Sequence, residues 1–208
     1  PNRGYDMTPT MYSPDGRIYQ VEYALETVKR GTLAIGIMTK DGIVLAVEEK
    51  TRALQVEGIT QKIFQVDDHI GVAAAGYIPD ARVQVDNARY FSQSNKLTYD
   101  EPVDIETVAK HLADQNHQFT QYSGVRPFGV ALIIAGIDRK GVNVYVIDPS
   151  GTYNSYSAIA IGTGSDEVNE FLFMMAKEKG ANSTYFKHSV YGLRFFFRLY
   201  DLEDRILK

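Results

Sequence analysis

The 208-residue sequence contains no cysteine, carries little net charge and has no long apolar run. Without cysteine the chain cannot form a disulfide, a thiolate metal site or a cysteine nucleophile, and it is compatible with a reducing compartment. A formal charge of −4 gives no basic surface of the kind that binds nucleic acid or an anionic membrane. The longest apolar run, residues 130–137, is far shorter than the roughly 20 residues of a membrane helix. We therefore expect a cytoplasmic single-domain protein with no nucleic-acid or membrane partner.

The clearest local pattern is an amphipathic helix between a turn and a glycine. Its apolar side chains recur at helical spacing: Ile18, Val21, Leu25 and Val28. Residues 13–16, Ser-Pro-Asp-Gly, are typical of a turn that leads into a helix, and Gly31 ends it. A helix of about 13 residues is marginally stable alone, so its apolar stripe must be buried. We predict a helix over 17–30 that contacts a neighbouring subunit, because it precedes the first strand of the domain.

Apolar runs separated by turn residues predict strands on both sides of a pair of helices. The first four runs predict an antiparallel sheet: 33–39, 43–48, 62–66 and 69–76. Helices are then predicted at 80–93 and, with Asp104 as its cap, from there to about residue 121. Further strands are predicted at 129–138, 142–148 and 153–161, followed by a helix near 167–177. This order is typical of two stacked sheets between helical layers.

Three stretches resemble the signatures of proteasome α subunits, and they occur in the family's order. The first combines Tyr5-Asp6 with residues 12–17 (YSPDGR) and 20–24 (QVEYA), and the others are residues 124–130 (GVRPFGV) and 148–152 (DPSGT). This resemblance, which extends from residue 5 to about 176, implies an α+β fold. That fold is the four-layer αββα sandwich of amino-terminal-nucleophile (Ntn) hydrolases, with two antiparallel sheets between helix layers. It also implies a seven-membered α ring stacked on a ring of β subunits.

The resemblance is weaker toward the carboxyl end. Residues 186–194 are similar to part of the family's last helix, and residues 195–207 to its closing strand and helix. Between Arg194 and Phe195 the family has additional chain that includes a strand, so either the subunit is shorter there or a segment is omitted. We treat residues 1–208 as one α-type domain, with a gate tail at 1–12, the ring-contact helix at 17–30 and the sandwich at 33–208.

Thr32 raises the question of catalysis. In the related β subunits, cleavage of a Gly-Thr bond makes a threonine the first residue, and its own amine activates its hydroxyl. Gly31-Thr32, Glu48 and Lys62 resemble the nucleophile, the acidic partner and the lysine of that site. A free α-amine, with a pKa of about 7.7–8.0, accepts a proton near neutral pH, whereas the amide nitrogen of Thr32, with 31 residues attached, cannot.

We therefore expect a non-catalytic α subunit that forms the outer ring, gates substrate entry and docks ATPase activators. Its expected partners are other α subunits, β subunits, the carboxyl-terminal tails of ATPase activators and unfolded proteins in transit. Two alternatives remain open: a processed β-type threonine peptidase with Thr32 as nucleophile, and a free-standing binding protein with the same sandwich.

The resemblance implies an activator-docking role for Lys62, Gly16 and Gly31. In archaeal-type α subunits the lysine at the place of Lys62 pairs with the terminal carboxylate of an activator tail, in a pocket between adjacent subunits. Glycine at positions 16 and 31 lets the tail approach the backbone closely. The alternative for Lys62 is an ordinary solvated lysine at the start of a strand.

The resemblance also implies a gate made by the amino-terminal tail. The residues that match the family's gate-ordering cluster are Tyr5, Asp6, Pro14 and Tyr23. In that cluster, tyrosine hydroxyls and a carboxylate hold the tail in an open arrangement around a reverse turn, where proline fixes φ. Two half-buried tyrosines and a turn proline are the alternative interpretation of the same residues.

No cofactor or metal site is expected. The four histidines lack the spacing of metal ligands: His69, His111, His117 and His188. Residues 162–165 predict a tight turn and not a phosphate loop, because no third glycine and no lysine follow at the required spacing. Arg126-Pro127 fits either a rigid turn into a strand or a subunit contact.

Overall fold

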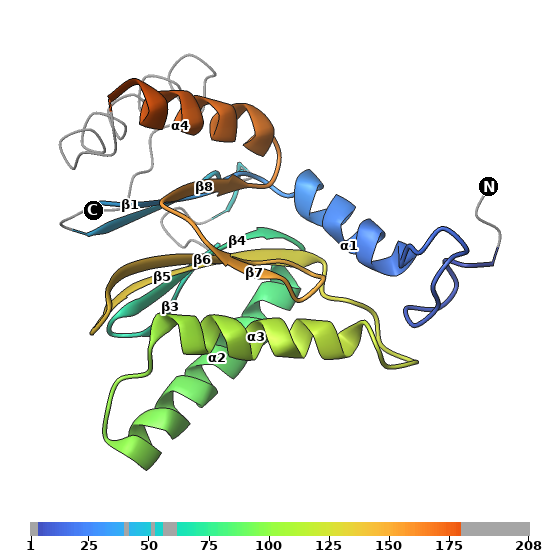
Figure 1. Cartoon of the computed structure of the whole chain (residues 1–208), viewed down its shortest axis with the longest axis horizontal. Helices are drawn as coiled ribbons and strands as arrows, with labels where there is room; N and C mark the ends of the chain where they lie inside the picture. Colours follow the sequence, from blue (N-terminus) through green and yellow to red (C-terminus); the bar gives the residue numbers. More distant parts are fainter. Residues whose placement is uncertain (1–3, 40–41, 51–52, 56–61, 180–208) are drawn as a thin grey trace.

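Four layers of secondary structure lie one above another in the protein (Figure 1). The computed structural model describes residues 4–39, 42–50, 53–55 and 62–179. From one side to the other, the layers are a helix, a three-stranded sheet, a five-stranded sheet and a pair of helices (Figure 1). The predicted α+β sandwich of two antiparallel sheets between helix layers is therefore confirmed.

The smaller sheet has the strand order β2-β1-β8, with both pairs antiparallel. Its strands are β1 (Ala34–Met38), β2 (Ile43–Val47) and β8 (Ala158–Ile161). Helix α4 (Ser165–Lys179) covers its outer face (Figure 1), where Val168 and Leu172 pack against Leu33 and Ile35. Because β1 is the central strand, the residues just before it are held at the middle of this sheet.

The larger sheet has the order β3-β4-β5-β6-β7, and all of its pairs are antiparallel. Its strands are β3 (Ile63–Asp67), β4 (Ile70–Gly76), β5 (Val130–Asp138), β6 (Gly141–Ile147) and β7 (Tyr153–Ser155). Helices α2 (Ile78–Tyr99) and α3 (Ile105–Phe119) cover its outer face (Figure 1). Helix α2 is therefore longer at both ends than the predicted 80–93.

Small and large apolar side chains of both sheets pack together between them. Ala34 of β1 packs there with Ala73, Ala75 and Ala135 of the larger sheet, all almost fully buried. A Cβ atom added at Gly36 would lie 2.7 Å from Ile133, so this position leaves no room for a side chain. A larger residue in this layer would have to push the sheets apart.

Two predictions about the strands were wrong in the same way. The first four runs do not share one sheet, because β1 and β2 belong to the smaller sheet and β3 and β4 to the larger one. The run at 153–161 also divides, into β7 of the larger sheet and β8 of the smaller one. The N–H of Tyr156 donates to Val144 of the larger sheet, and Ser157 accepts from Met38 of the smaller sheet. An apolar pattern identifies a strand but not the sheet that it joins.

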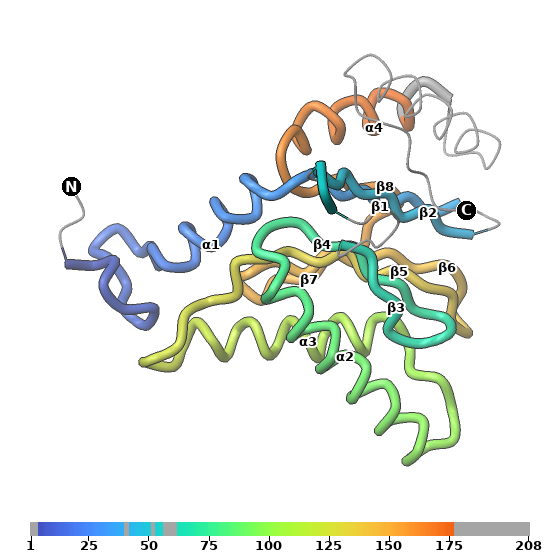
Figure 2. The backbone as a smooth tube through the Cα atoms, turned by 180° about the vertical axis from the view of Figure 1, so that it is seen from behind, coloured from blue at the N-terminus to red at the C-terminus, as the bar shows by residue number. Residues whose placement is uncertain are grey.

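Helix α1 (Tyr19–Arg30) lies against β4 and β5, at the end of the sandwich from which the amino-terminal segment projects (Figure 2). It buries Tyr19, Ala24 and Val28. Ile18, Val21 and Leu25 of the predicted stripe are only half-buried within the chain. Contact of this helix with a neighbouring subunit stays a prediction.

The last predicted elements, at 186–194 and 195–207, lie outside the described residues together with the junction at 194–195. In the part of the chain that is described, no helix combines the length and the apolar character that crossing a membrane requires.

Candidate functional site

The junction between α1 and β1 is held by contacts with the backbone of other elements. Gly31 ends α1, and its N–H donates to the carbonyl of Val28 (3.0 Å). A Cβ atom added at Gly31 would lie only 2.2 Å from the nitrogen of Gly76 at the end of β4. Within this chain, glycine is required at position 31 by that close approach. Gly16 differs, because its φ of +78° favours glycine although nothing lies within 4 Å of an added Cβ.

Lys62 points into this junction from the residue before β3, and its ammonium is surrounded by oxygen atoms. The residue is only 5% exposed. Its Nζ lies 2.8 Å from the carbonyl of Thr32, 2.6 Å from the Thr32 hydroxyl and 3.0 Å from the carbonyl of Leu33. The carbonyl of Glu48, just after β2, lies 3.1 Å away. The interpretation of Lys62 as an ordinary solvated lysine was therefore wrong.

The electrostatic environment of Lys62 opposes its charge. Burial lowers the pKa of Lys62 to about 8, although the carboxylates of Glu48 and Glu49 act in the opposite direction. At neutral pH most of the chains therefore carry the proton, and an appreciable minority do not. In its charged form the ammonium donates to these oxygens.

Thr32, Glu48 and Lys62 come together as their resemblance to a catalytic set predicts, but their contacts hold the backbone. The Glu48 carboxylate accepts from the N–H of Leu33 (3.3 Å). The carbonyl of Gly31 accepts from the N–H and the hydroxyl of Thr163, at 2.7 and 2.9 Å. In this continuous backbone the nitrogen of Thr32 is an amide, which cannot take a proton from the Thr32 hydroxyl.

A compact turn precedes α1 and fixes its start. Ser13 is buried; its N–H donates to the carbonyl of Arg17 (2.9 Å), and its hydroxyl oxygen accepts from the N–H of Arg17 (3.0 Å). Both oxygens of the Glu22 carboxylate accept from the Arg17 guanidinium, which also lies over the ring of Tyr19. Pro14 is exposed within this turn. The turn therefore links the amino-terminal segment to the first two turns of the helix.

The amino-terminal segment is held on α1 through Asp6. The hydroxyl of Tyr23 donates to Asp6 Oδ2 (3.2 Å), and the side-chain amide of Gln20 donates to the Asp6 carbonyl. Tyr5 is partly exposed, and within the described residues its hydroxyl makes no hydrogen bond. Of the four predicted gate residues, the structure therefore brings Asp6 and Tyr23 into contact. Gln20 was missed, although its position three residues before Tyr23 on a helix is a signal for it.

Arg126 finds a partner that the sequence did not indicate. Its guanidinium donates to both carboxylate oxygens of Asp80 near the start of α2, at 2.6 and 2.9 Å. Burial alone would raise the pKa of Asp80, but hydrogen bonds from Arg126 and from the N–H of Gly129 outweigh this effect and lower the pKa. These contacts fix the turn that enters β5, as the rigid-turn interpretation requires.

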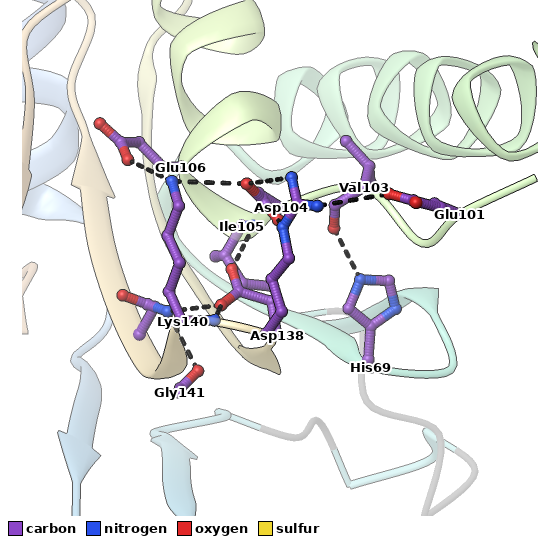
Figure 3. A network of polar contacts seen from close by, with 11 residues as sticks. His69, Glu101, Val103, Asp104, Ile105, Glu106, Asp138, Lys140 and Gly141 are labelled. Atoms are coloured by element: carbon purple, nitrogen blue, oxygen red, sulfur yellow. Dashed lines mark hydrogen bonds and ion pairs between the residues drawn. The ribbon is translucent and has the colours of Figure 1, made fainter. Parts of the chain in front are cut away.

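A network of charged side chains ties the turns at the opposite end of the larger sheet (Figure 3). Asp104 is the N-cap residue of α3, as predicted, but its side chain makes no cap hydrogen bond. Asp138, at the end of β5, accepts from the N–H of Ile105 instead (2.9 Å), while Asp104 contacts Arg139 and Lys140 at 3.2 and 3.4 Å. Asp138 can accept this hydrogen bond in place of Asp104 because the β5–β6 turn lies beside the start of α3.

The same turns line a pocket of about 490 Å³. Its carboxylates Glu101, Asp104 and Asp138 already bind groups of this chain, and His69 contacts the carbonyl of Val103 (Figure 3). Across the described ranges, no three His, Asp or Glu side chains gather as the ligands of a metal ion would. These groups therefore connect secondary structure elements.

Two family profiles match this sequence, and their matches meet within α1. The profile of the proteasome subunit family matches residues 28–187, and the profile of the N-terminal signature of A-type proteasome subunits matches residues 5–26. The first match includes Thr32, Glu48 and Lys62. The second includes the turn before α1, together with Asp6, Gln20 and Tyr23.

Archaeal proteins named as alpha subunits of the proteasome are similar to about four-fifths of the chain. The protein from Methanosarcina barkeri is 49% identical over 172 residues, which are 82% of this chain and 69% of that protein. The protein from Halobacterium salinarum is 48% identical over 171 residues, 82% of this chain and 68% of its own length. The protein from Archaeoglobus fulgidus is 49% identical over 172 residues, 82% of this chain and 70% of its own length.

Proposed function

This chain belongs to the proteasome subunit family as an α-type member, and from that membership we propose that it forms the outer ring of a proteasome core particle without being a peptidase. One observation carries the proposal. The structured turn and helix α1, which the A-type signature covers, run in continuous backbone into Thr32. In this arrangement Thr32 has no α-amine of its own to activate its hydroxyl.

The ring neighbours are other α subunits, seven to a ring, and the second ring consists of β subunits that carry the threonine peptidase sites. Partial exposure of Ile18, Val21 and Leu25 supports a contact between neighbours along α1, since association would bury more of their apolar surface. The lack of cysteine fits a cytoplasmic particle.

The amino-terminal segment gates the axial entrance through which unfolded proteins reach the peptidase sites. The contacts of Asp6 with Gln20 and Tyr23 support this role, because they hold the segment on a helix whose core side chains are buried. Tyr5 and Pro14 complete the gate cluster. Both are exposed within the chain, as residues that meet a ring neighbour would be before assembly.

ATPase activators dock their carboxyl-terminal tails beside Lys62, Gly16 and Gly31. Lys62 is mostly protonated at neutral pH, which suits an incoming carboxylate. Its ammonium has three N–H groups for four oxygens of its own chain, so a tail has to displace one of these contacts.

Reconstitution with β subunits tests both roles. Deleting residues 1–8 should raise hydrolysis of a short unfolded peptide by the assembled particle, and an unchanged rate would contradict the gate. Lys62→Ala should weaken hydrolysis stimulated by an ATPase activator, measured relative to basal hydrolysis in particles whose native mass equals that of the wild type, because the variant also leaves buried carbonyls without their donor. Lys50→Ala is the matched control, because the Lys50 side chain is 78% exposed. Equal stimulation of the two variants would rule out docking at Lys62.

The short contact between Lys62 and the Thr32 hydroxyl keeps a second candidate open, a processed β-type threonine peptidase. The intact mass of the working protein separates the two, because a mature chain that begins at Thr32 would reverse the assignment. Native mass spectrometry also tests the third possibility, a free-standing binding protein, which would remain monomeric.

A further inference from the structure

Two side chains of α1 hold the same residue of the amino-terminal segment, and they hold different parts of it. Gln20 donates its side-chain amide to the main-chain carbonyl of Asp6, which lies 14 residues earlier. Tyr23 donates its hydroxyl to the carboxylate of Asp6. Because Gln20 and Tyr23 are three residues apart on a helix, they lie on one face and act on Asp6 together.

The helix turn that carries both side chains is itself fixed. Tyr19 is buried beneath it, and its ring stacks with that of Tyr23 at a centroid distance of 6.4 Å. The Arg17 guanidinium, bound to both oxygens of Glu22, closes the other side of the same turn. Gln20 and Tyr23 therefore contact Asp6 from a helix turn that is held by its own packing and ion pair.

We propose that Gln20 is a positioning residue that sets the main-chain direction of the amino-terminal segment, alongside the contact that Tyr23 makes. A hydrogen bond to a carboxylate leaves the main chain free to turn about the side-chain torsions of Asp6. A hydrogen bond to the carbonyl fixes the peptide plane itself. This inference rests on the proposed gate function and adds a residue to it. The orientation of the peptide plane at the Asp6 carbonyl determines the direction in which the residues before Asp6 extend.

The size of the effect follows from a single hydrogen bond. A typical intramolecular hydrogen bond changes an equilibrium by roughly twofold to tenfold. Removing the Gln20 amide should therefore raise the population of detached segment by about that factor. Removing both contacts should release more than the sum of the two changes, because either one alone still tethers Asp6.

Because the chain contains no cysteine, a single introduced thiol can report the mobility of the amino-terminal segment. Met7 follows Asp6 and is 86% exposed, so Met7→Cys accepts a nitroxide label as the only thiol of the chain. Electron paramagnetic resonance of the assembled ring then reports the mobility of the segment. Gln20→Ala and Tyr23→Phe should each raise that mobility. Glu26→Ala, an equivalent truncation at an exposed position of α1, should leave it unchanged.

Peptide hydrolysis by the reconstituted particle gives a second readout. Because Asp6 belongs to the cluster that holds the segment in the open arrangement, Gln20→Ala should lower the rate of the full-length particle roughly twofold to tenfold. It should have no effect in a particle that already lacks residues 1–8, where Asp6 is absent. A loss that merely weakened the fold would lower the rate in both particles, so this comparison separates positioning from general stability.

The outcomes are distinct. Unchanged label mobility in Gln20→Ala, with the fold retained by circular dichroism, overturns the inference. Raised mobility with lowered hydrolysis supports both the inference and the gate. Raised mobility with unchanged or raised hydrolysis supports the positioning role of Gln20 and contradicts the proposed gate.

Discussion

Replacing Lys62 with methionine keeps the unbranched apolar part of the side chain but removes the ammonium, the donor that the carbonyls of Thr32, Leu33 and Glu48 share. The Leu33 carbonyl still accepts from the N–H of Glu48 (2.8 Å), so the substitution orphans the carbonyls of Thr32 and Glu48. An orphaned carbonyl in a buried position costs about 1–3 kcal/mol, so the two together destabilise the folded chain by roughly 4 kcal/mol. The substitution also removes the cost of burying an ammonium. Burial lowers the pKa of Lys62 from its ordinary value of 10.5 to about 8, so this cost is roughly 3 kcal/mol. The net loss at pH 7 should be about 1 kcal/mol.

The pH dependence of that loss has a definite sign. Below pH 8 the folded and unfolded chains both hold the proton, and the full cost of the charge is present. Between pH 8 and 10.5 the unfolded chain binds more protons than the folded chain, so the free energy of unfolding rises with pH. Lys62 should therefore contribute about 1 kcal/mol more stability at pH 9 than at pH 7. The methionine variant has no titrating group at this position, so its loss should grow by that amount.

Urea unfolding at pH 7, 8 and 9, at one fixed protein concentration, measures the difference between the two chains. Lys50→Met is the control, because it makes the same chemical change on an exposed side chain and should show no such dependence on pH. If the free energies of unfolding of the wild type and of Lys62→Met differ by the same amount at pH 7 and pH 9, the reasoning about the Lys62 charge is refuted. A Lys62→Met chain more stable than the wild type would refute the reasoning about the carbonyls.

Two further substitutions test the other structural claims. Gly31→Ala should destabilise the chain by more than about 3 kcal/mol, because its Cβ would overlap the backbone of Gly76. Gly16→Ala should cost only about 1–2 kcal/mol, because only its positive φ is unfavourable. Equal losses of stability in thermal unfolding would show that a side chain fits at position 31. Asp138→Ala should lower the free energy of unfolding by about 1 kcal/mol and speed hydrogen exchange at the N–H of Ile105. Asp104→Ala should leave that exchange rate unchanged. Faster exchange in the Asp104 variant alone would show that the Asp104 side chain, and not Asp138, caps the helix.

Local features of the sequence were sufficient for most elements of the fold. The turn at residues 13–16, the spacing of Ile18 to Val28 and the stop at Gly31 together identified α1, because helix starts, stripes and ends depend on neighbours within a few residues. Apolar runs and turn residues identified the strands for the same reason. The resemblance of residues 5–24 to α subunits indicated the family, and it did so without any knowledge of the packing.

Tertiary packing alone decided the contacts between distant parts of the chain. Residues 153–161 read as one strand, yet the backbone of Tyr156 and Ser157 bonds to different sheets, and no local pattern encodes that choice. Asp138 caps a helix that begins 33 residues earlier, because the β5–β6 turn happens to lie beside it. The sequence singled out Lys62 by its resemblance to a docking lysine, but only the packing of β1, β2 and β3 brought four oxygens around its ammonium. The sequence by itself determined which segments form helices and strands and which family they resemble, whereas only the folded chain determined the charge, burial and partners of the residues at its site.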